Sequence, residues 1–361
     1  MLQGGGALGA YQAGVFESLA KGYCAPTWVA GISIGAINAA LVTGNPPATR
    51  VARLREFWDL VTSGARAPLI APLLGARETL NESSASQALL FGVPGFFKPR
   101  FPPAPFQPRG TLEAISYYDT SALQSTLERL VDFDRINAGP VRLSVGAVNV
   151  RTGNFAYFDS SRQRLDARHI MASGALPPGF APVEIDGEHY WDGGLVSNTP
   201  LQYVLDQPGK QRRVVFQVDL FAARGALPAT LNEVTEREKD IRFSSRTRMN
   251  TTVEMDRQVI AQAAKRLLAK LPPDLQNDPD VQALSQLRCE SAVEVVHLIY
   301  RSKHYESQSK DYEFSRLSMN EHWDAGRADM AHTLRDPRWT HRAEQATGVH
   351  VYDLASRPSH G

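Results

Sequence analysis

Short unbroken apolar runs alternate along the chain with segments in which apolar residues recur every three or four positions. The runs predict buried strands, at 1–3, 27–30, 140–150, 155–158, 183–185, 189–191, 213–221 and 292–300. The periodic segments predict helices, at 8–19, 36–42, 50–62, 118–131, 166–173, 249–271 and 314–334. Strands and helices that alternate in this way favour an α/β fold, in which helices flank a mostly parallel central sheet.

Turn residues between neighbouring runs predict two hairpins within this sheet. Residues 151–154 separate one pair of runs, and the dipeptide Asp186-Gly187 separates the next pair. The run at 140–150 is the clearest strand in the sequence, so we expect it near the centre of the sheet.

Residues 64–110 follow neither pattern. Prolines divide this segment into short apolar pieces such as 89–91 and 96–97, so regular sheet is not expected there. These prolines are Pro68, Pro72, Pro94, Pro99, Pro102, Pro103, Pro105 and Pro108. Because long loops inside a compact domain usually serve a function, we hypothesise a lid or an access surface for an apolar substrate. The alternative is an insertion that covers part of the core.

Length, charge and hydrophobic content limit the classes of protein to consider. A chain of 361 residues can form one large α/β domain or two smaller ones. With 39 basic and 38 acidic residues the net charge is +1, so we expect no nucleic-acid partner. Hydrophobic residues make up 43% of the chain, but no apolar run approaches the ~20 residues that a membrane span needs.

The start of the chain and its cysteines bear on the cellular compartment. Met1-Leu2-Gln3 has neither the basic region nor the apolar core of a signal peptide, so we expect a cytoplasmic protein. Secretion without a cleaved signal stays open as an alternative, as does a natural start upstream of Met1, because three residues make a poor strand. Cys24 and Cys289 are too few for a disulfide framework and lack metal-ligand spacing.

A serine lies between a predicted strand and a predicted helix, in the sequence Gly31-Ile32-Ser33-Ile34-Gly35. A serine at such a turn has a strained backbone that exposes its hydroxyl, and the glycines let strand and helix approach closely. The start of the helix also directs unpaired N–H groups toward this point. Ser33 is therefore a candidate nucleophile, although a tight turn that merely contains serine fits the same pattern.

Glycines form a second candidate site where the first strand meets the first helix. Gly4, Gly6 and Gly9 match G-x-G-x-x-G, the dinucleotide-binding fingerprint, which also requires an acidic residue about 20 positions on. That place holds residues 28–31, which include no carboxylate. We therefore favour an oxyanion hole, in which amides exposed by the glycines stabilise a tetrahedral intermediate formed at Ser33. A purely structural glycine turn is the third alternative.

Asp192 is the second candidate for catalysis. Two glycines, Gly193 and Gly194, follow it, so its carboxylate lies on a turn that another segment can approach closely. A serine hydroxyl needs a proton acceptor within hydrogen-bond reach, and a carboxylate can serve as one. Asp-Gly is also a common turn sequence without any catalytic role.

These three motifs, together with the segment Leu195-Val196-Ser197-Asn198-Thr199-Pro200-Leu201, resemble the patatin-like phospholipase family in order and spacing over roughly residues 1–220. The resemblance implies a three-layer α/β/α fold and a lipid acyl hydrolase with a serine–aspartate dyad and no catalytic histidine.

By this resemblance Ser33 is the nucleophile, Asp192 is the base, and Gly4, Gly5 and Gly6 supply the amides of the oxyanion hole. The expected reaction is of phospholipase A type and proceeds through an acyl-enzyme on an acyl lipid, with transient contact with a membrane surface. No metal or other cofactor is expected, because no Asp/His cluster for calcium or zinc is visible in the sequence.

The resemblance also implies a division of the chain into a catalytic domain at 1–235 and a C-terminal helical extension at 236–361, as in a bacterial subgroup of the family. The amphipathic helix expected at 249–271 carries several basic residues. It either lies on a membrane surface or, as we favour because acidic residues are interspersed, packs on the body of the protein with a solvated face.

Three alternatives stay open for the function. The first is a carboxylesterase or thioesterase that acts on soluble acyl esters, and the second is a lipid-binding protein without catalysis. The third is a serine–acid–histidine triad, for which His304 is the best-placed histidine because it follows a late predicted strand. We expect His169, His189 and His322 to be structural or surface residues.

Overall fold

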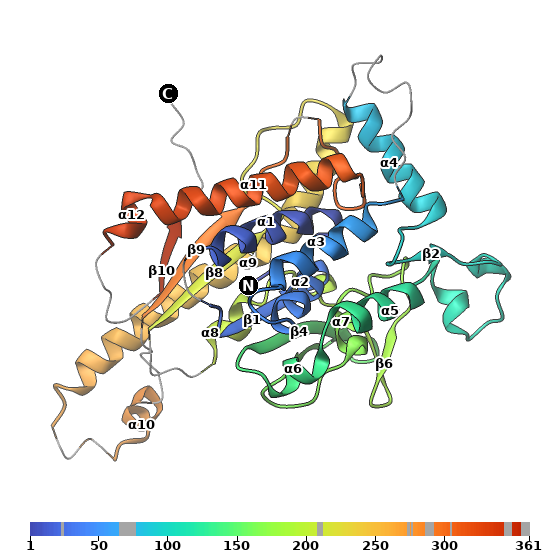
Figure 1. Ribbon diagram of the computed structural model, residues 1–361. Coiled ribbons are helices and arrows are strands. Elements are labelled where there is room, and N and C mark those ends of the chain that lie inside the picture. Colours follow the sequence, from blue (N-terminus) through green and yellow to red (C-terminus); the bar gives the residue numbers. More distant parts are fainter. Residues whose placement is uncertain are drawn as a thin grey trace.

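The computed structural model describes residues 1–22, 25–64, 77–207, 212–272, 275, 277–285, 292–303, 305–342 and 349–354 (Figure 1). Its helices are α1 (Gly9–Ala20), α2 (Ile34–Thr43), α3 (Arg50–Val61), α4 (Arg77–Phe91), α5 (Ser121–Leu130), α6 (Phe133–Ala138), α7 (Ala167–Ser173), α8 (Leu201–Leu205), α9 (Leu231–Leu268), α10 (Pro279–Ser285), α11 (Arg316–Arg335) and α12 (Pro337–Thr340). Its strands are β1 (Trp28–Ile32), β2 (Lys98–Pro99), β3 (Tyr118–Asp119), β4 (Arg142–Asn149), β5 (Phe155–Asp159), β6 (Val183–Ile185), β7 (Glu188–Asp192), β8 (Arg213–Asp219), β9 (Val293–Ile299) and β10 (Val349–Asp353).

The central sheet consists of two groups of strands that residue Leu2 joins. One group has the order β10-β9-β8, and the other has the order β1-β4-β7-β6 with β5 also paired to β4. Leu2 forms parallel bridges to Gly31 of β1 and to Val218 of β8, so the segment before the glycines continues the sheet across the gap. The strand predicted at 1–3 is therefore reduced to a single bridging residue.

The directions of the strands confirm a mostly parallel sheet with β4 near its centre. The pairs β1–β4, β8–β9 and β9–β10 are parallel, whereas β5 and β7 run antiparallel to β4. The hairpins predicted around 151–154 and Asp186-Gly187 are present as β4–β5 and β6–β7. Asp186 and Gly187 both have positive φ, as this kind of tight turn requires.

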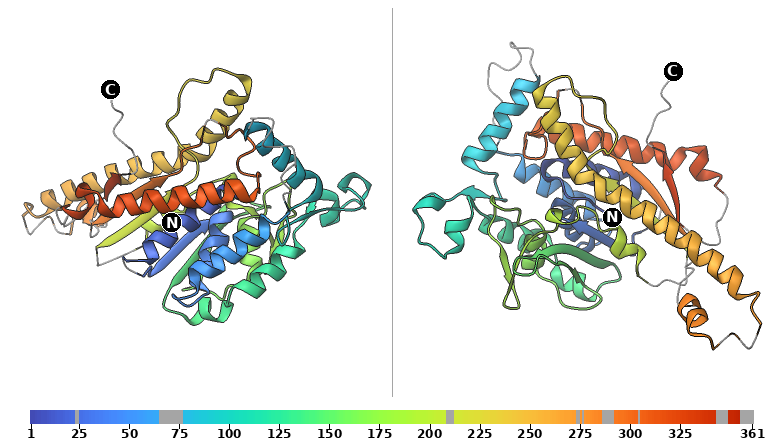
Figure 2. Two further views of the ribbon diagram at one scale, coloured as in Figure 1. Left: turned by 45° about the horizontal axis from the view of Figure 1, so that its top comes forward. Right: turned by 180° about the vertical axis from the view of Figure 1, so that it is seen from behind.

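Helices cover both faces of the sheet, which gives the three-layer α/β/α arrangement. In Figure 1, α1 and α11 lie in front of the strands, and the view from behind in Figure 2 shows α9 crossing the opposite face. Helices α1 and α11 approach closely because each has a glycine at the contact. A Cβ atom at Gly14 would lie 1.9 Å from the carbonyl oxygen of Trp323, and one at Gly326 would lie 2.0 Å from that of Tyr11.

Several boundaries differ from those predicted, for reasons that the local sequence explains. The helix predicted over 118–131 begins at Ser121, because Tyr118–Asp119 forms β3 and the Asp119 carboxylate accepts from the Ser121 N–H. Helix α9 begins at Leu231, well before 249, since its first half is largely polar and has no apolar period to detect.

Several elements were not predicted, and α4 and β10 show why. Helix α4 lies within the proline-rich segment, and its residues Arg77–Phe91 include neither proline nor glycine, so the prolines fall outside it. In the described part of 64–110 the only strand is the two-residue β2, which agrees with the expected lack of regular sheet. Strand β10 is a five-residue edge strand whose apolar pattern is too short to predict.

The buried carboxylate of Asp159, on β5, forms hydrogen bonds with side chains of β4 and α8. It accepts hydrogen bonds from the Arg142 Nε (2.9 Å) and Nη2 (2.6 Å), the Ser144 hydroxyl (2.7 Å) and the Tyr203 hydroxyl (2.7 Å). Although burial opposes ionisation, these hydrogen bonds hold the pKa of Asp159 well below its usual range. The folded state therefore contains Asp159 in its ionised form.

The variant Asp159→Asn is expected to lower the free energy of unfolding by about 3 kcal/mol at pH 7, because it leaves Arg142 without its counter-ion. Because the pKa is depressed in the folded state, this loss should shrink as the pH falls below about 4, where the unfolded chain binds the proton. Urea denaturation measures both effects. The exposed pair Asp134–Arg164 provides the control, and Asp134→Asn should change stability by less than about 0.5 kcal/mol. Equal losses of stability in both variants would contradict the stabilising role of the Asp159 carboxylate.

Candidate active site

The order of strands explains why Ser33 and Asp192 lie together. Strands β1 and β7 share one edge of β4 but run in opposite directions, so their carboxyl ends meet there. The last residue of β1, Ile32, pairs with Gly146, and the last residue of β7, Asp192, pairs with the next residue of β4, Ala147. Ser33 follows Ile32 directly, so its side chain and the Asp192 carboxylate lie next to each other and line the same cavity.

The backbone of Ser33 has the sharp turn that the sequence predicts. Its φ and ψ are 55° and −123°, in a region that residues other than glycine rarely adopt, and α2 begins at the next residue. The Ser33 N–H donates to the hydroxyl of Ser173 over 3.0 Å, and that hydroxyl donates to the carbonyl of Gly146 over 2.6 Å. Buried Ser173, at the end of α7, therefore holds the turn against β4.

Glycines on both sides of Ser33 are required by close backbone contacts. A Cβ atom at Gly31 would lie 2.2 Å from the carbonyl oxygen of Gly35, and one at Gly35 would lie 2.3 Å from that of Leu2. Neither neighbour is the end of a flexible side chain, so a larger residue at either position would displace the backbone. The motif thus reflects the packing of β1, α2 and the first residues of the chain.

Asp192 is buried, and its environment shifts its proton affinity upward. Burial raises its pKa to about 6, although the nearby Ser33 hydroxyl and a hydrogen bond from the Gly194 N–H favour the ionised form. This hydrogen bond is 2.7 Å long and forms within the turn that follows β7. At pH 7 the carboxylate is mostly ionised, yet it is basic enough to accept a proton.

The three predicted oxyanion glycines differ in what their N–H groups do. The N–H of Gly4 donates to the carbonyl of Asn198 (3.2 Å), and the Asn198 amide donates back to the carbonyl of Gly4 (2.9 Å). In the described part of the chain, the N–H groups of Gly5, Gly6 and Ile34 have no acceptor. Gly6 has φ of 53°, and a Cβ atom there would lie 2.0 Å from the carbonyl oxygen of Asp311.

An apolar cavity of about 300 Å³ opens in front of Ser33 and Asp192. The aromatic rings around it contact one another, with centroids 5.2 Å apart for Phe97 and Phe180 and 6.1 Å apart for Phe96 and Phe314. The apolar side chains that line it are Leu89, Phe96, Phe97, Tyr118, Leu176, Phe180, Phe221, Phe243, Tyr312 and Phe314. The proline-rich segment thus supplies part of the cavity wall, as a lid or access surface would.

The C-terminal part of the chain also lines this cavity, through the segment 311–314. The carbonyl of Asp311 accepts from the N–H of Ala7 over 2.7 Å, directly after the glycines. The neighbouring Lys310 is buried, and its ammonium donates to carboxylates of α9, at 2.9 Å to Glu236 and 2.8 Å to Asp240. These contacts fix the segment between the glycines and α9.

Histidines do not contribute to the cavity in the part of the chain that the structure describes. His322 is buried and lies 2.6 Å from a carboxylate oxygen of Glu306, and His169 belongs to the cap at the start of α7. Both are structural, as expected. His304, the best-placed member of an alternative triad, lies outside the described residues.

Sequence reasoning missed Ser173, because a lone serine at the end of a short helix carries no motif. Ser173→Ala would remove both the acceptor of the Ser33 N–H and the donor to Gly146. We expect a loss of about 1–3 kcal/mol in the free energy of unfolding, since two buried polar groups lose their partners. Urea denaturation should show this loss, whereas Ser63→Ala at an exposed site should show almost none. A Ser173→Ala variant as stable as the wild type would contradict this role.

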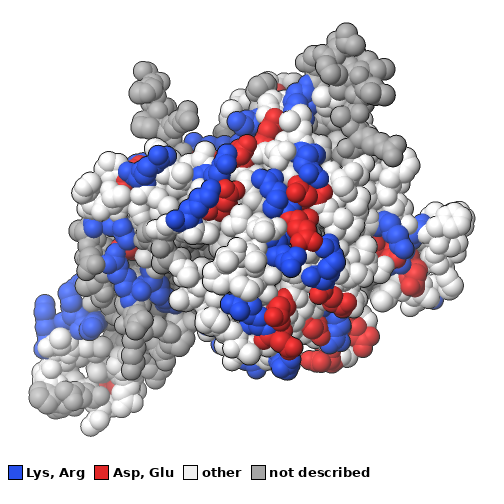
Figure 3. All heavy atoms as spheres, in the orientation of Figure 1, with Lys and Arg blue, Asp and Glu red and all other residues white. Residues whose placement is uncertain are grey.

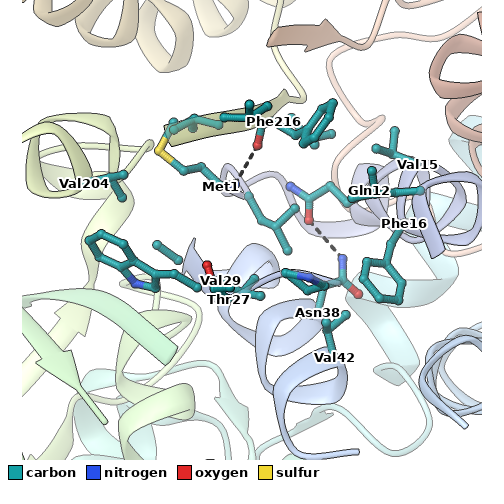
Figure 4. Close-up of a pocket in the computed structure, with 18 of the residues that line it drawn as sticks. Met1, Gln12, Val15, Phe16, Thr27, Val29, Asn38, Val42, Val204 and Phe216 are labelled. Carbon is teal, nitrogen blue, oxygen red and sulfur yellow. Dashed lines mark hydrogen bonds between the residues drawn. The ribbon is translucent and has the colours of Figure 1, made fainter. Parts of the chain in front are cut away.

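A second and larger cavity, of about 480 Å³, lies between the amino-terminal halves of β1 and β8 (Figure 4). The Met1 amine donates to the carbonyl of Phe216 at its edge over 2.7 Å, and the Asn38 amide donates to the Gln12 side chain over 2.9 Å. Neither Ser33 nor Asp192 lines this cavity. The candidate site is therefore the smaller cavity.

A three-layer α/β fold with a serine on a sharp strand-to-helix turn, beside an apolar cavity, is the architecture of many acyl hydrolases. The chain belongs to the patatin-like phospholipase family, whose model matches residues 1–205. A second model, described as patatin phospholipase, matches residues 241–346.

Comparisons with individual proteins add little to this assignment. No curated protein matches the chain. Among solved structures, VipD from Legionella pneumophila is similar at 15% identity and a TM-score of 0.33, over 89% of this chain. The chain spans 66% of the length of the VipD chain.

Among the described residues, no helix is both long enough and apolar enough to cross a bilayer.

Proposed function

We propose that the protein is a phospholipase A-type acyl hydrolase that cleaves fatty-acyl esters with Ser33 and Asp192 as a catalytic dyad. The observation that carries the proposal is that Ser33 and the buried carboxylate of Asp192 meet at the carboxyl ends of β1 and β7 and line one cavity. Backbone N–H groups that have no acceptor among the described residues, and an apolar cavity next to this pair, support the same reaction.

In the first half of the reaction the Ser33 Oγ attacks the ester carbonyl while Asp192 accepts the hydroxyl proton. The N–H groups of Gly5, Gly6 and Ile34 stabilise the negative charge that develops on the carbonyl oxygen. The N–H of Gly4 is bonded to the carbonyl of Asn198 instead, so Gly4 holds the glycine loop in position. When the intermediate collapses, the C–O bond to the alcohol breaks, and the proton on Asp192 passes to the leaving oxygen.

In the second half, water attacks the acyl-enzyme at the same carbonyl, and Asp192 accepts a proton from the water. The fatty acid leaves, and the proton returns to the Ser33 oxygen. Each step uses the same carboxylate alternately as base and acid.

The lining of the cavity supports a long apolar acyl group as substrate. Aromatic and aliphatic side chains surround the cavity on most sides, and such a lining binds a hydrocarbon chain by removing its surface from water. We further propose that the catalytic domain at 1–235 and the extension at 236–361 together form the binding site for the acyl chain. Phe243 and Phe314 of the extension line the cavity together with Leu89 and Phe96 of the catalytic domain.

A fluorophosphonate probe tests the proposal, since it reacts covalently with an activated serine. We expect the adduct on the tryptic peptide that contains Ser33, identified by mass spectrometry, and no adduct in the heat-unfolded protein. Labelling elsewhere, or none, would overturn the proposal and leave a lipid-binding protein without catalysis.

A chain-length series of esters, presented as monomers and as aggregates, then distinguishes a phospholipase from an esterase of soluble substrates. We expect kcat/KM to rise with chain length and to be highest on aggregated lipid. The opposite order would favour a carboxylesterase or thioesterase.

A further inference from the structure

Residues 100–117 form a lobe that projects from the body of the protein at the right of Figure 1. The antiparallel pair β2–β3 closes its base, with Lys98 paired to Asp119 in register. Two short 3₁₀ turns, Ala104–Phe106 and Leu112–Ile115, pack against each other inside it. The lobe is thus a folded segment that lies outside the hydrophobic core.

The tip of the lobe exposes large apolar side chains to solvent. Phe101 is 95% exposed and Phe106 is 79% exposed. At the end of α4, beside the base of the lobe, Phe91 is 76% exposed. Isolated apolar residues on a surface are ordinary, but several aromatic rings on one projection indicate a surface that binds something apolar.

The distribution of charge on the lobe fits the interface of a phospholipid bilayer. Residues 101–108 contain no charged residue, and Arg100 and Arg109 flank them on both sides. The outer end of the lobe is correspondingly almost free of coloured atoms in Figure 3. An uncharged aromatic tip can enter the apolar region of a bilayer while the flanking arginines reach the lipid phosphates.

The base of the lobe adjoins the cavity that holds Ser33. Leu89 of α4 and Leu176 both line that cavity and are partly exposed, so they form its rim. The hydroxyl of Tyr118, at the base of the lobe, donates to the carbonyl of Leu89 over 2.9 Å. The ring of Tyr118 also lies 4.8 Å from that of Phe97 in the cavity wall.

We propose that the tip of this lobe inserts Phe101 and Phe106 into the surface of a phospholipid bilayer and thereby sets the rim of the cavity against the lipid. This inference rests on the proposed function, because it names the physical state in which the substrate reaches the site. An acyl chain can then pass from the bilayer to the cavity along Leu89 and Leu176 without full exposure to water.

Binding to vesicles tests the proposal separately from catalysis. The probe is sedimentation with phosphatidylcholine vesicles, and all proteins carry Ser33→Ala so that no lipid is hydrolysed. We expect the double variant Phe101→Ser/Phe106→Ser to lower the partition coefficient at least about tenfold, because two inserted rings are lost. Both side chains are exposed, so the fold should survive, as circular dichroism would verify.

The matched control is Ile260→Ser/Leu267→Ser, which removes two exposed apolar side chains from the second half of α9. This part of α9 lies on the side of the molecule away from the lobe in Figure 1. We expect the control to partition as the parent does. If the control loses binding and the lobe variant keeps it, α9 is the membrane surface and the proposal is overturned.

Two further outcomes would also reject the lobe as a bilayer-binding surface. One is a parent protein that does not sediment with vesicles at all. The other is a dimer in solution that the lobe variant converts to a monomer while vesicle binding is unchanged, which would assign the tip to a second copy of the chain. With Ser33 restored, the lobe variant should lose hydrolysis of vesicle lipid about tenfold but keep hydrolysis of a soluble short-chain ester. Loss of both activities would instead indicate damage to the site.

Discussion

Replacing Ser33 with alanine is expected to lower the hydrolysis of p-nitrophenyl acyl esters by about 10³-fold or more, to the level of the uncatalysed reaction. The reason is chemical, since the variant has no oxygen to form the acyl-enzyme. Unpaired N–H groups next to Ser33 could still bind the ester, so KM should change much less than kcat. Initial rates over a range of ester concentrations separate the two effects.

The stability of this variant must be measured together with its activity. Alanine can adopt the same backbone conformation as Ser33 at a similar cost, and the Ser33 N–H bond to Ser173 does not involve the lost hydroxyl. We therefore expect a free energy of unfolding within about 1 kcal/mol of the wild type. Ser63→Ala, on the surface, serves as the control for activity. Hydrolysis retained by a folded Ser33→Ala protein would exclude Ser33 as the nucleophile.

The local parts of the site could be predicted because each depends on a few neighbouring residues. The turn at Ser33 needs glycine at 31 and 35 because backbone atoms lie there, and the same contacts produce the G-x-S-x-G pattern. The amides of Gly5 and Gly6 are open because glycine has no side chain to cover them. Motifs of this kind can be recognised from the sequence since the physical constraint lies within a short segment.

The meeting of Ser33 with Asp192 could not be derived from these motifs alone. It depends on β7 pairing with the same edge of β4 as β1, directly beyond the last residue that β1 pairs with. Strand pairing of this kind is set by contacts between distant parts of the chain, and no local pattern encodes it. Before the structure, the resemblance to a known family was the reason to pair the two residues.

The proline-rich segment illustrates a different limit of prediction from the sequence. Its prolines predict irregular structure, and the structure agrees for 92–117, where 3₁₀ turns and loops dominate. The role of the segment depends on where its aromatic residues point. Phe96 and Phe97 enter the cavity wall, whereas Phe101 and Phe106 point into solvent, although the same sequence pattern surrounds all four. Tertiary packing makes this distinction.

Asp192→Asn is expected to lower kcat/KM by about 10³- to 10⁴-fold, because asparagine preserves the shape of the side chain but cannot accept the Ser33 proton. In the wild type, activity should rise with pH through a midpoint near 6, since burial raises the pKa of Asp192 to about 6 and only the ionised carboxylate is a base. The residual activity of the variant should lack this midpoint. Rates between pH 4.5 and 8 with a soluble ester give both results.

The same pKa shift predicts the opposite effect on stability. The folded-state pKa of Asp192 is about 6, above the value of about 3.9 in an unfolded chain, so the folded protein loses stability as the pH rises through this interval. Above pH 6 the wild type carries this full cost, whereas Asp192→Asn carries none. The variant should therefore unfold at equal or higher urea concentration at pH 7, by up to about 2 kcal/mol, and this gain should vanish near pH 4. A variant that is both inactive and less stable at pH 7 would show that Asp192 supports the fold rather than the reaction.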